Sequence, residues 1–175
     1  PRSFAVAVTV RTALLAGQGR REALSRCLKQ SLVAGAAGSL ILLTAAWIWL
    51  EPLLQAAGAQ PSYLLSAVEY GRPMLLSLFF TALSTVLQGG LLGIGRTRSM
   101  LLSNVIGNGA NILVNALLIY GLGPFPRMGV AGAGWGTVAG AALTLAMTAV
   151  SLARGEGYLR GRGGWRPTIA HLGPM

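Results

Sequence analysis

Four asparagines recur at helical spacing inside one long run without charged side chains, residues 99–126. Asn104, Asn108, Asn111 and Asn115 are separated by steps of four, three and four. Because an α-helix turns by about 100° per residue, these steps place all four carboxamides on one side of a helix. Carboxamides can donate and accept hydrogen bonds or coordinate a cation, and each one left unpaired in lipid is costly. The spacing therefore predicts a face turned toward other helices or toward a polar cavity.

The composition indicates a membrane protein made of helices. Hydrophobic residues make up 53% of the chain and charged residues 10%, far below the quarter that is typical of soluble domains. The formal net charge of +10 could suggest nucleic acid as a partner. We do not favour that interpretation, because the arginines lie in short segments beside hydrophobic runs and form no basic face with interleaved aromatic residues. The expected partner is the lipid bilayer, and the expected fold class is an all-α, polytopic helical bundle.

Four stretches are long and apolar enough to cross a bilayer, since about 20 residues suffice. These predicted spans cover about 31–50, 73–95, 99–126 and 128–153. Residues 3–10 are apolar but too short, so we interpret them as the end of a span whose beginning is absent, in a chain that is part of a longer protein. Residues 52–68 contain two prolines and are predicted to be an external connection, and 154–175 a basic linker or tail.

Basic clusters alternate with nearly neutral connections along the chain. The positive-inside rule then places the loops at 11–30, 96–98 and 154–175 in the cytoplasm of a multi-pass protein of the cell's inner (plasma) membrane. In the predicted spans no side chain can take up a proton near neutral pH. They also lack histidine, cysteine and carboxylates, so we expect no enzyme activity and no metal site; Cys27 and His171 are isolated.

Glycines at small-residue spacing point to close helix packing. Gly132, Gly136 and Gly140 form two overlapping G-x-x-x-G patterns, and further glycines follow Gln88 at the end of the second span. Thr137, in the same turn as Gly136, could bond across an interface or back to its own helix.

Several ordered motifs resemble the multidrug and toxic compound extrusion (MATE) family. The matching segments are 16–23, 87–98, 104–121 and 126–137, and the similarity runs from about residue 3 to residue 153. The resemblance implies that residues 1–153 form a partial N-terminal transmembrane lobe, from the end of its second helix to its sixth. It also implies a second lobe as a partner.

The resemblance further implies secondary active export of amphipathic or cationic drug-like compounds in exchange for H⁺ or Na⁺, by rocking of two bundles and without an organic cofactor. Some relatives have a cation site built by polar residues that Asn111, Asn115 and Thr137 match. Where some relatives have aspartate, this chain has Asn115, and the acidic residue of the first helix lies outside the sequence. The candidate substrate- or cation-binding residues are Asn108, Asn111, Asn115, Thr137 and Gln88.

Two alternatives stay open. One is a flippase for lipid-linked oligosaccharides from the same superfamily, whose members tend to place basic residues in the cavity; the predicted spans contain none. The other is a membrane remnant or interaction module that transports nothing.

Overall fold

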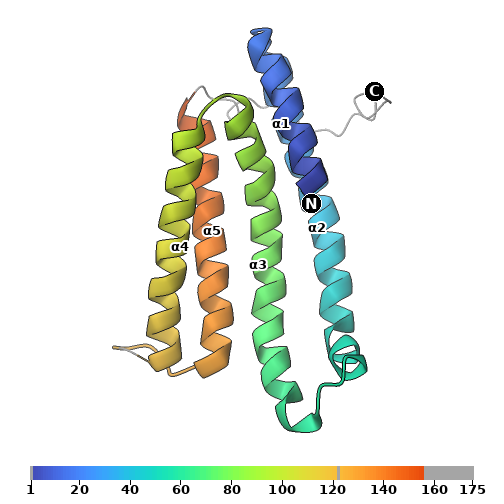
Figure 1. Ribbon diagram of the computed structural model, residues 1–175, viewed down its shortest axis with the longest axis vertical. Helices are drawn as coiled ribbons and strands as arrows, with labels where there is room; N and C mark the ends of the chain where they lie inside the picture. Colours follow the sequence, from blue (N-terminus) through green and yellow to red (C-terminus); the bar gives the residue numbers. More distant parts are fainter. Residues whose placement is uncertain (1, 122, 156–175) are drawn as a thin grey trace.

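In the computed structural model, residues 2–121 and 123–155 are described, and they form helices joined by short connections (Figure 1). The helices are α1 (Arg2–Gly17), α2 (Arg21–Ala56), α3 (Pro61–Gly93), α4 (Thr97–Tyr120) and α5 (Gly129–Gly155). All except α1 are long and apolar enough to cross a membrane. The described residues contain no strand. The predicted class of all-α membrane protein is confirmed.

The observed helix bounds differ from the predicted spans near prolines and turns. α2 continues through Pro52 and α3 begins at Pro61, so the connection predicted over 52–68 shrinks to residues 57–60. Proline suits the first turn of α3, and inside α2 it removes one backbone hydrogen bond without ending the helix. α4 ends earlier than the predicted span, at Tyr120, because Gly121 adopts a left-handed conformation with φ of 68° and caps the helix.

The cytoplasmic loop predicted over 11–30 is mostly helix. Only residues 18–20 connect α1 to α2. Arg11 lies six residues before the end of α1 and Lys29 eight residues after the start of α2, which corresponds to about 9 and 12 Å along the helix axes. Lys29 is only 1% exposed. The structure therefore places two basic residues inside helices, contrary to the predicted spans. The predicted tail at 154–175 lies outside the described residues beyond its first two positions.

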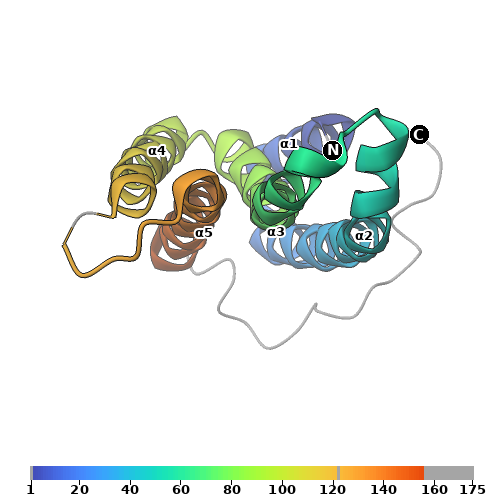
Figure 2. The same ribbon diagram turned by 90° about the horizontal axis from the view of Figure 1, so that it is seen from below.

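α3 separates two pairs of helices. Viewed along the bundle, α1 and α2 lie on one side of α3, and α5 lies on the other side, between α3 and α4 (Figure 2). α4 packs mainly against α5 and meets α3 at few residues. α1 and α2 make no contact with α4.

The best-packed part of the bundle is one end, where α1, α3 and α5 end and α2 and α4 begin. We call it the basic end, since exposed arginines gather there: Arg20, Arg21, Arg26, Arg96, Arg98 and Arg154. Its buried core consists of Val8, Leu24, Leu28, Val86, Leu87, Leu91 and Leu152. Toward the opposite end the apolar side chains are mostly exposed, as expected for helices surrounded by lipid.

Glycines bring the backbones of α4 and α5 into close contact. A Cβ atom added at Gly140 would lie 2.8 Å from the carbonyl oxygen of Gly107 and 2.7 Å from the Cβ of Asn111. One added at Gly132 would lie 2.9 Å from the backbone of Leu118. The prediction that the G-x-x-x-G residues serve close packing is confirmed.

We expect alanine to be tolerated poorly at Gly140 and well at Gly109. Gly109 lies on the same helix pair but has nothing within 4 Å of an added Cβ. Gly140→Ala should destabilise the chain by about 1–3 kcal/mol through overpacking, whereas Gly109→Ala should be neutral or stabilise α4 by up to about 1 kcal/mol. Unfolding of both variants in mixed detergent micelles measures the difference. Equal effects at the two positions would contradict the packing described above.

Candidate functional site

The asparagine face of α4 divides into three parts, which differ in their partners. Asn104, nearest the basic end, accepts a hydrogen bond from Nε2 of Gln88 on α3, at 3.0 Å. Both side chains are half-buried. The bond crosses between two helices that otherwise meet little, and it links the Gln88 carboxamide of α3 to the Asn104 carboxamide of α4.

Asn111 and Asn115 form a second amide pair, pressed against α5. Nδ2 of Asn115 donates to Oδ1 of Asn111 at 3.0 Å, within α4. Gly136 lies directly against the Asn115 carboxamide, and Gly140 against Asn111, so a side chain at either glycine would displace an asparagine. The small-residue face of α5 thus makes the room that these two carboxamides occupy.

One acceptor in this pair has no partner. Oδ1 of Asn115 is buried and accepts no hydrogen bond from any described residue; it is the one buried side-chain oxygen or nitrogen of the described chain for which this is so. Leaving a buried acceptor unsatisfied costs about 1–3 kcal/mol. The atom can accept a hydrogen bond or coordinate a cation, but Gly136 covers it, so a ligand reaches it only where α4 and α5 move apart.

Asn108 is the free member of the stripe. It is exposed, and no hydrogen bond involves its side chain in the described part of the chain. The opposite face of α4 is apolar: Leu102 is 59% exposed and Leu113 61%. α4 therefore has one face of amides and one face suited to lipid, with Asn108 on the amide side.

Thr137 lies on α5, one residue after the glycine that contacts Asn115. It is half-buried, and its Oγ1 donates to the carbonyl oxygen of Ala133 in the preceding turn at 3.0 Å. This bond uses the hydroxyl proton and leaves the oxygen able to accept or to coordinate. The structure does not join Thr137 to either asparagine by a hydrogen bond; it brings Asn111 and Asn115 together and pairs Gln88 with Asn104.

The two helices that build this site carry no acidic side chain among the described residues. α4 and α5 contain neither aspartate nor glutamate, and the described residues contain no group of three histidines, cysteines or carboxylates that could hold a metal ion. The amide and hydroxyl oxygens can coordinate a cation or receive hydrogen bonds. They cannot take up a proton near neutral pH.

Two features of the structure were missed in the sequence. Gln88 meets the asparagine stripe, as the family resemblance implies, but its bond to Asn104 in particular depends on the rotation of two helices, which no single spacing reveals. Lys29 is predicted to lie in a loop. Leu24 and Leu28, which precede it, are four residues apart, and this helical spacing continues into the apolar run at 31–50.

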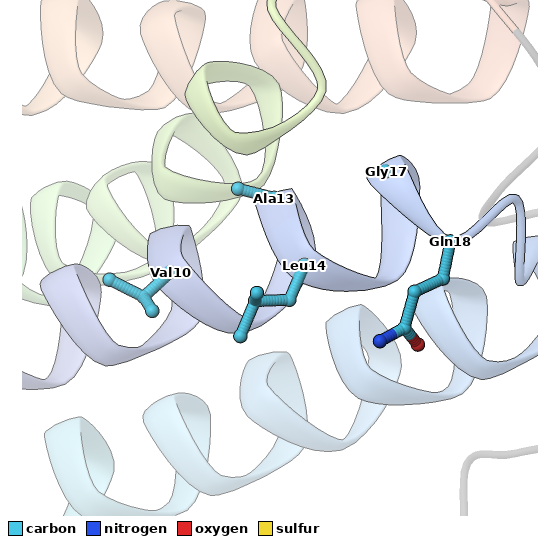
Figure 3. A pocket seen from close by; sticks show the side chains of 5 residues that line it. All are labelled: Val10, Ala13, Leu14, Gly17 and Gln18. Atoms are coloured by element: carbon cyan, nitrogen blue, oxygen red, sulfur yellow. The ribbon is translucent and has the colours of Figure 1, made fainter.

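A concave surface lies elsewhere, on α1. It is a shallow, open hollow of about 520 Å³, lined by Val10, Ala13, Leu14, Gly17 and Gln18 (Figure 3). Its lining is apolar except for the Gln18 carboxamide. Because α1 does not touch α4, this concavity is separate from the asparagine face.

Comparisons with known proteins agree with the fold. Solved transporter structures match the bundle at 24% sequence identity. One is an outward-facing conformation of a multidrug resistance MATE family transporter of the MOP superfamily, with a TM-score of 0.83 over 97% of this chain and 37% of that one. Another is the inward-facing conformation of such a transporter, with a TM-score of 0.78 over 98% and 37%.

The sequence comparisons point the same way. Multidrug resistance protein PmpM from Pseudomonas aeruginosa is 34% identical over 91 residues, which are 52% of this chain and 19% of that protein. The chain thus spans about a fifth of this curated relative's length. The family model MatE matches residues 1–117. The chain therefore belongs to the MATE family, as the resemblance of its motifs implied.

Proposed function

We propose that this chain forms most of one lobe of a secondary active multidrug exporter. The exporter moves amphipathic or cationic compounds out of the cell in exchange for H⁺ or Na⁺. Membership of the MATE family supports this assignment, and so does the likeness of the bundle to both an outward- and an inward-facing transporter. The names of those relatives describe those proteins; the activity assigned to this chain is our proposal.

The amide site on α4 and α5 is the observation that carries the proposal. Oδ1 of Asn115 is a buried acceptor without a partner, and Asn111 holds its carboxamide in place through Nδ2. Polar groups inside membrane helices commonly mark the path of a substrate or an ion. In this proposal Asn108, Asn111, Asn115 and Thr137 line a polar cavity that binds a cation or the polar group of a substrate, and Gln88 lies at the edge of that cavity.

The charge that couples transport must come from outside α4 and α5. Carboxamide and hydroxyl oxygens can replace part of the hydration shell of Na⁺, whereas H⁺ coupling needs a titrating group. Neither helix has an acidic residue. We therefore assign these residues to coordination and orientation, and the coupling carboxylate to a segment that packs against the amide face.

A second lobe is the expected partner. The chain spans 37% of the solved transporters that its fold matches. Alternating access by rocking needs two bundles that move against each other around a central site. We propose that the described helices form part of one such bundle.

Arg11 and Lys29 lie inside helices, and basic residues within the cavity would favour the flippase alternative. Both are on α1 and α2, which do not contact α4. Arg98 is on α4 itself but lies about 120° around the helix from Asn104. The asparagine face of the described chain therefore carries no basic residue, and a drug exporter is the better assignment. Export of an amphipathic dye, or its absence, also separates the exporter from a remnant that transports nothing.

Removing both amides of the pair should impair transport. In the full-length transporter that carries these residues, Asn111→Ala with Asn115→Ala should reduce ion-driven dye efflux by at least about tenfold, since each lost contact in a binding site costs about 1 kcal/mol or more. Efflux from cells that lack their own exporters measures this effect. Leu113→Ala, on the apolar face of α4, is the matched control and should change efflux little. Normal efflux by the double variant at normal membrane levels would refute the site assignment.

The basic end should face the cytoplasm. Six exposed arginines of the described chain lie there, against two, Arg72 and Arg127, toward the opposite end, and the positive-inside rule predicts this orientation. In a Cys27→Ser background, Arg98→Cys should react with a membrane-impermeant maleimide only after the cells are opened. Gln60→Cys, in the connection at the opposite end, should react in intact cells. The reverse pattern would overturn the orientation.

A further inference from the structure

We propose that Arg96, Arg98 and Arg154 form a binding site for an anionic phospholipid at the basic end of the bundle. The three guanidinium groups hold the phosphate of the headgroup, and an acyl chain lies along the apolar face of α4 next to them. This surface is separate from the asparagine face, so the inference goes beyond the proposed function and does not depend on it.

The three arginines come together where the connection between α3 and α4 meets the last turn of α5 (Figure 1). Nη1 of Arg96, the residue before α4, donates a hydrogen bond to the carbonyl oxygen of Ser151 on α5, at 3.2 Å. Arg154 follows Ser151 by less than one turn of the same helix, and Arg98 lies in the first turn of α4. The Arg96 bond therefore ties the two helix ends together at the place where the other two arginines project.

The packing of α4 on α5 places Arg98 and Arg154 at the same level. Gly107 of α4 lies against Thr144 of α5. Arg98 precedes Gly107 by nine residues and Arg154 follows Thr144 by ten, which corresponds to about 14 and 15 Å along two antiparallel helices. The two side chains thus start at nearly the same depth, one from each helix of a closely packed pair.

No carboxylate of the described chain neutralises this cluster. α4 and α5 contain no acidic residue, and Glu69 of α3 lies toward the opposite end. Glu22 is the one described carboxylate at the basic end, and it is on α2, which contacts neither α4 nor α5. Arg98 and Arg154 are exposed and form no ion pair or hydrogen bond with a described residue. Since guanidinium groups without a counter-charge repel one another, an anion from outside the described chain stabilises the cluster.

Arg98 adjoins a face of α4 that is suited to lipid. Leu101, Leu102 and Val105 lie within about 60° of Arg98 around the helix. They are 61%, 59% and 59% exposed. A long cationic side chain at the end of such an apolar face reaches the level of the headgroups while its neighbours meet hydrocarbon. The surface therefore fits an amphipathic anion with an acyl chain better than it fits a small soluble anion.

The charge of the site favours an anionic headgroup over a zwitterionic one. Phosphatidylcholine carries a choline cation close to its phosphate, and the arginines repel that cation, whereas phosphatidylglycerol has none. Each basic residue near a membrane surface increases the attraction of anionic lipid by about fivefold. Three arginines at one place are thus expected to enrich phosphatidylglycerol beside α4.

Quenching by brominated lipids at residue 105 tests the inference. The full-length transporter that carries these residues is made with Val105→Cys as its one cysteine, in a Cys27→Ser background, and is labelled with a small fluorophore. It is reconstituted in bilayers of phosphatidylcholine with a minor share of phosphatidylglycerol. Placing bromine on the chains of either lipid, in otherwise identical bilayers, measures the share of each lipid beside α4. We expect phosphatidylglycerol to be enriched by at least about threefold over its share of the bilayer.

Two charge-matched variants separate a site from the overall charge of the basic end. Arg98→Gln with Arg154→Gln should abolish the enrichment. Arg20→Gln with Arg26→Gln removes the same charge from the same end, but on the other side of α3, and should leave most of the enrichment. All four arginines are exposed, so neither variant disturbs a packed position.

Inorganic phosphate distinguishes a lipid from a free anion. Replacing chloride by phosphate at constant ionic strength should leave the enrichment unchanged. If phosphate removes the enrichment, the arginines bind a free anion and the lipid site is refuted.

An unaltered protein without enrichment, or an equal loss in the two double variants, would overturn the inference, since the arginines would then act only through the net charge of that end. None of these measurements depends on transport, so a negative result leaves the proposed function standing.

Discussion

The close approach of helix backbones at glycine is the constraint on which the rest of the structure depends. Helices gain little from hydrophobic burial against each other in lipid, so van der Waals contact and hydrogen bonds must hold them together. On α3, Gly89 and Gly90 bring in α1 and α2; on α5, Gly136 and Gly140 bring in α4. These last two glycines also leave the space that the carboxamides of Asn115 and Asn111 fill. Packing and the candidate site are thus built by the same residues.

The amides are divided between two tasks. Gln88 with Asn104 and Asn115 with Asn111 each form one hydrogen bond within the bundle. Oδ1 of Asn115 and the exposed side chain of Asn108 are left over. A structural role accounts for the paired groups, and the binding role that we propose concerns the remaining ones. Since α4 and α5 contain no acidic residue, binding there would have to be coupled to a charge supplied by another part of a transporter.

Sequence reasoning predicted the fold class and the asparagine face well, because both follow from strong patterns. The spacing of four, three and four fixed the side of α4 on which the asparagines lie, and the G-x-x-x-G spacing predicted close packing. It failed where position depends on tertiary contacts. Pro52 does not end α2, and Lys29 lies inside a helix. The spacing of residues along one helix could not predict that Gln88 bonds to Asn104 of another helix. The missing partner of Asn115 Oδ1 likewise appears only when the neighbouring helices are in place.

The central claim is that one face of α4 lines a polar cavity while the other meets lipid. Spin labels placed singly along residues 101–117, in the full-length transporter in lipid bilayers, test it most directly. Collision rates with a water-soluble nickel complex and with molecular oxygen are then measured at each position. We predict that accessibility to nickel peaks at Asn108, the exposed asparagine, and is lower at Asn104, Asn111 and Asn115, which pack against α3 and α5. Oxygen accessibility should peak on the opposite face, near Leu102 and Leu113. High oxygen and low nickel accessibility on both faces would contradict the account.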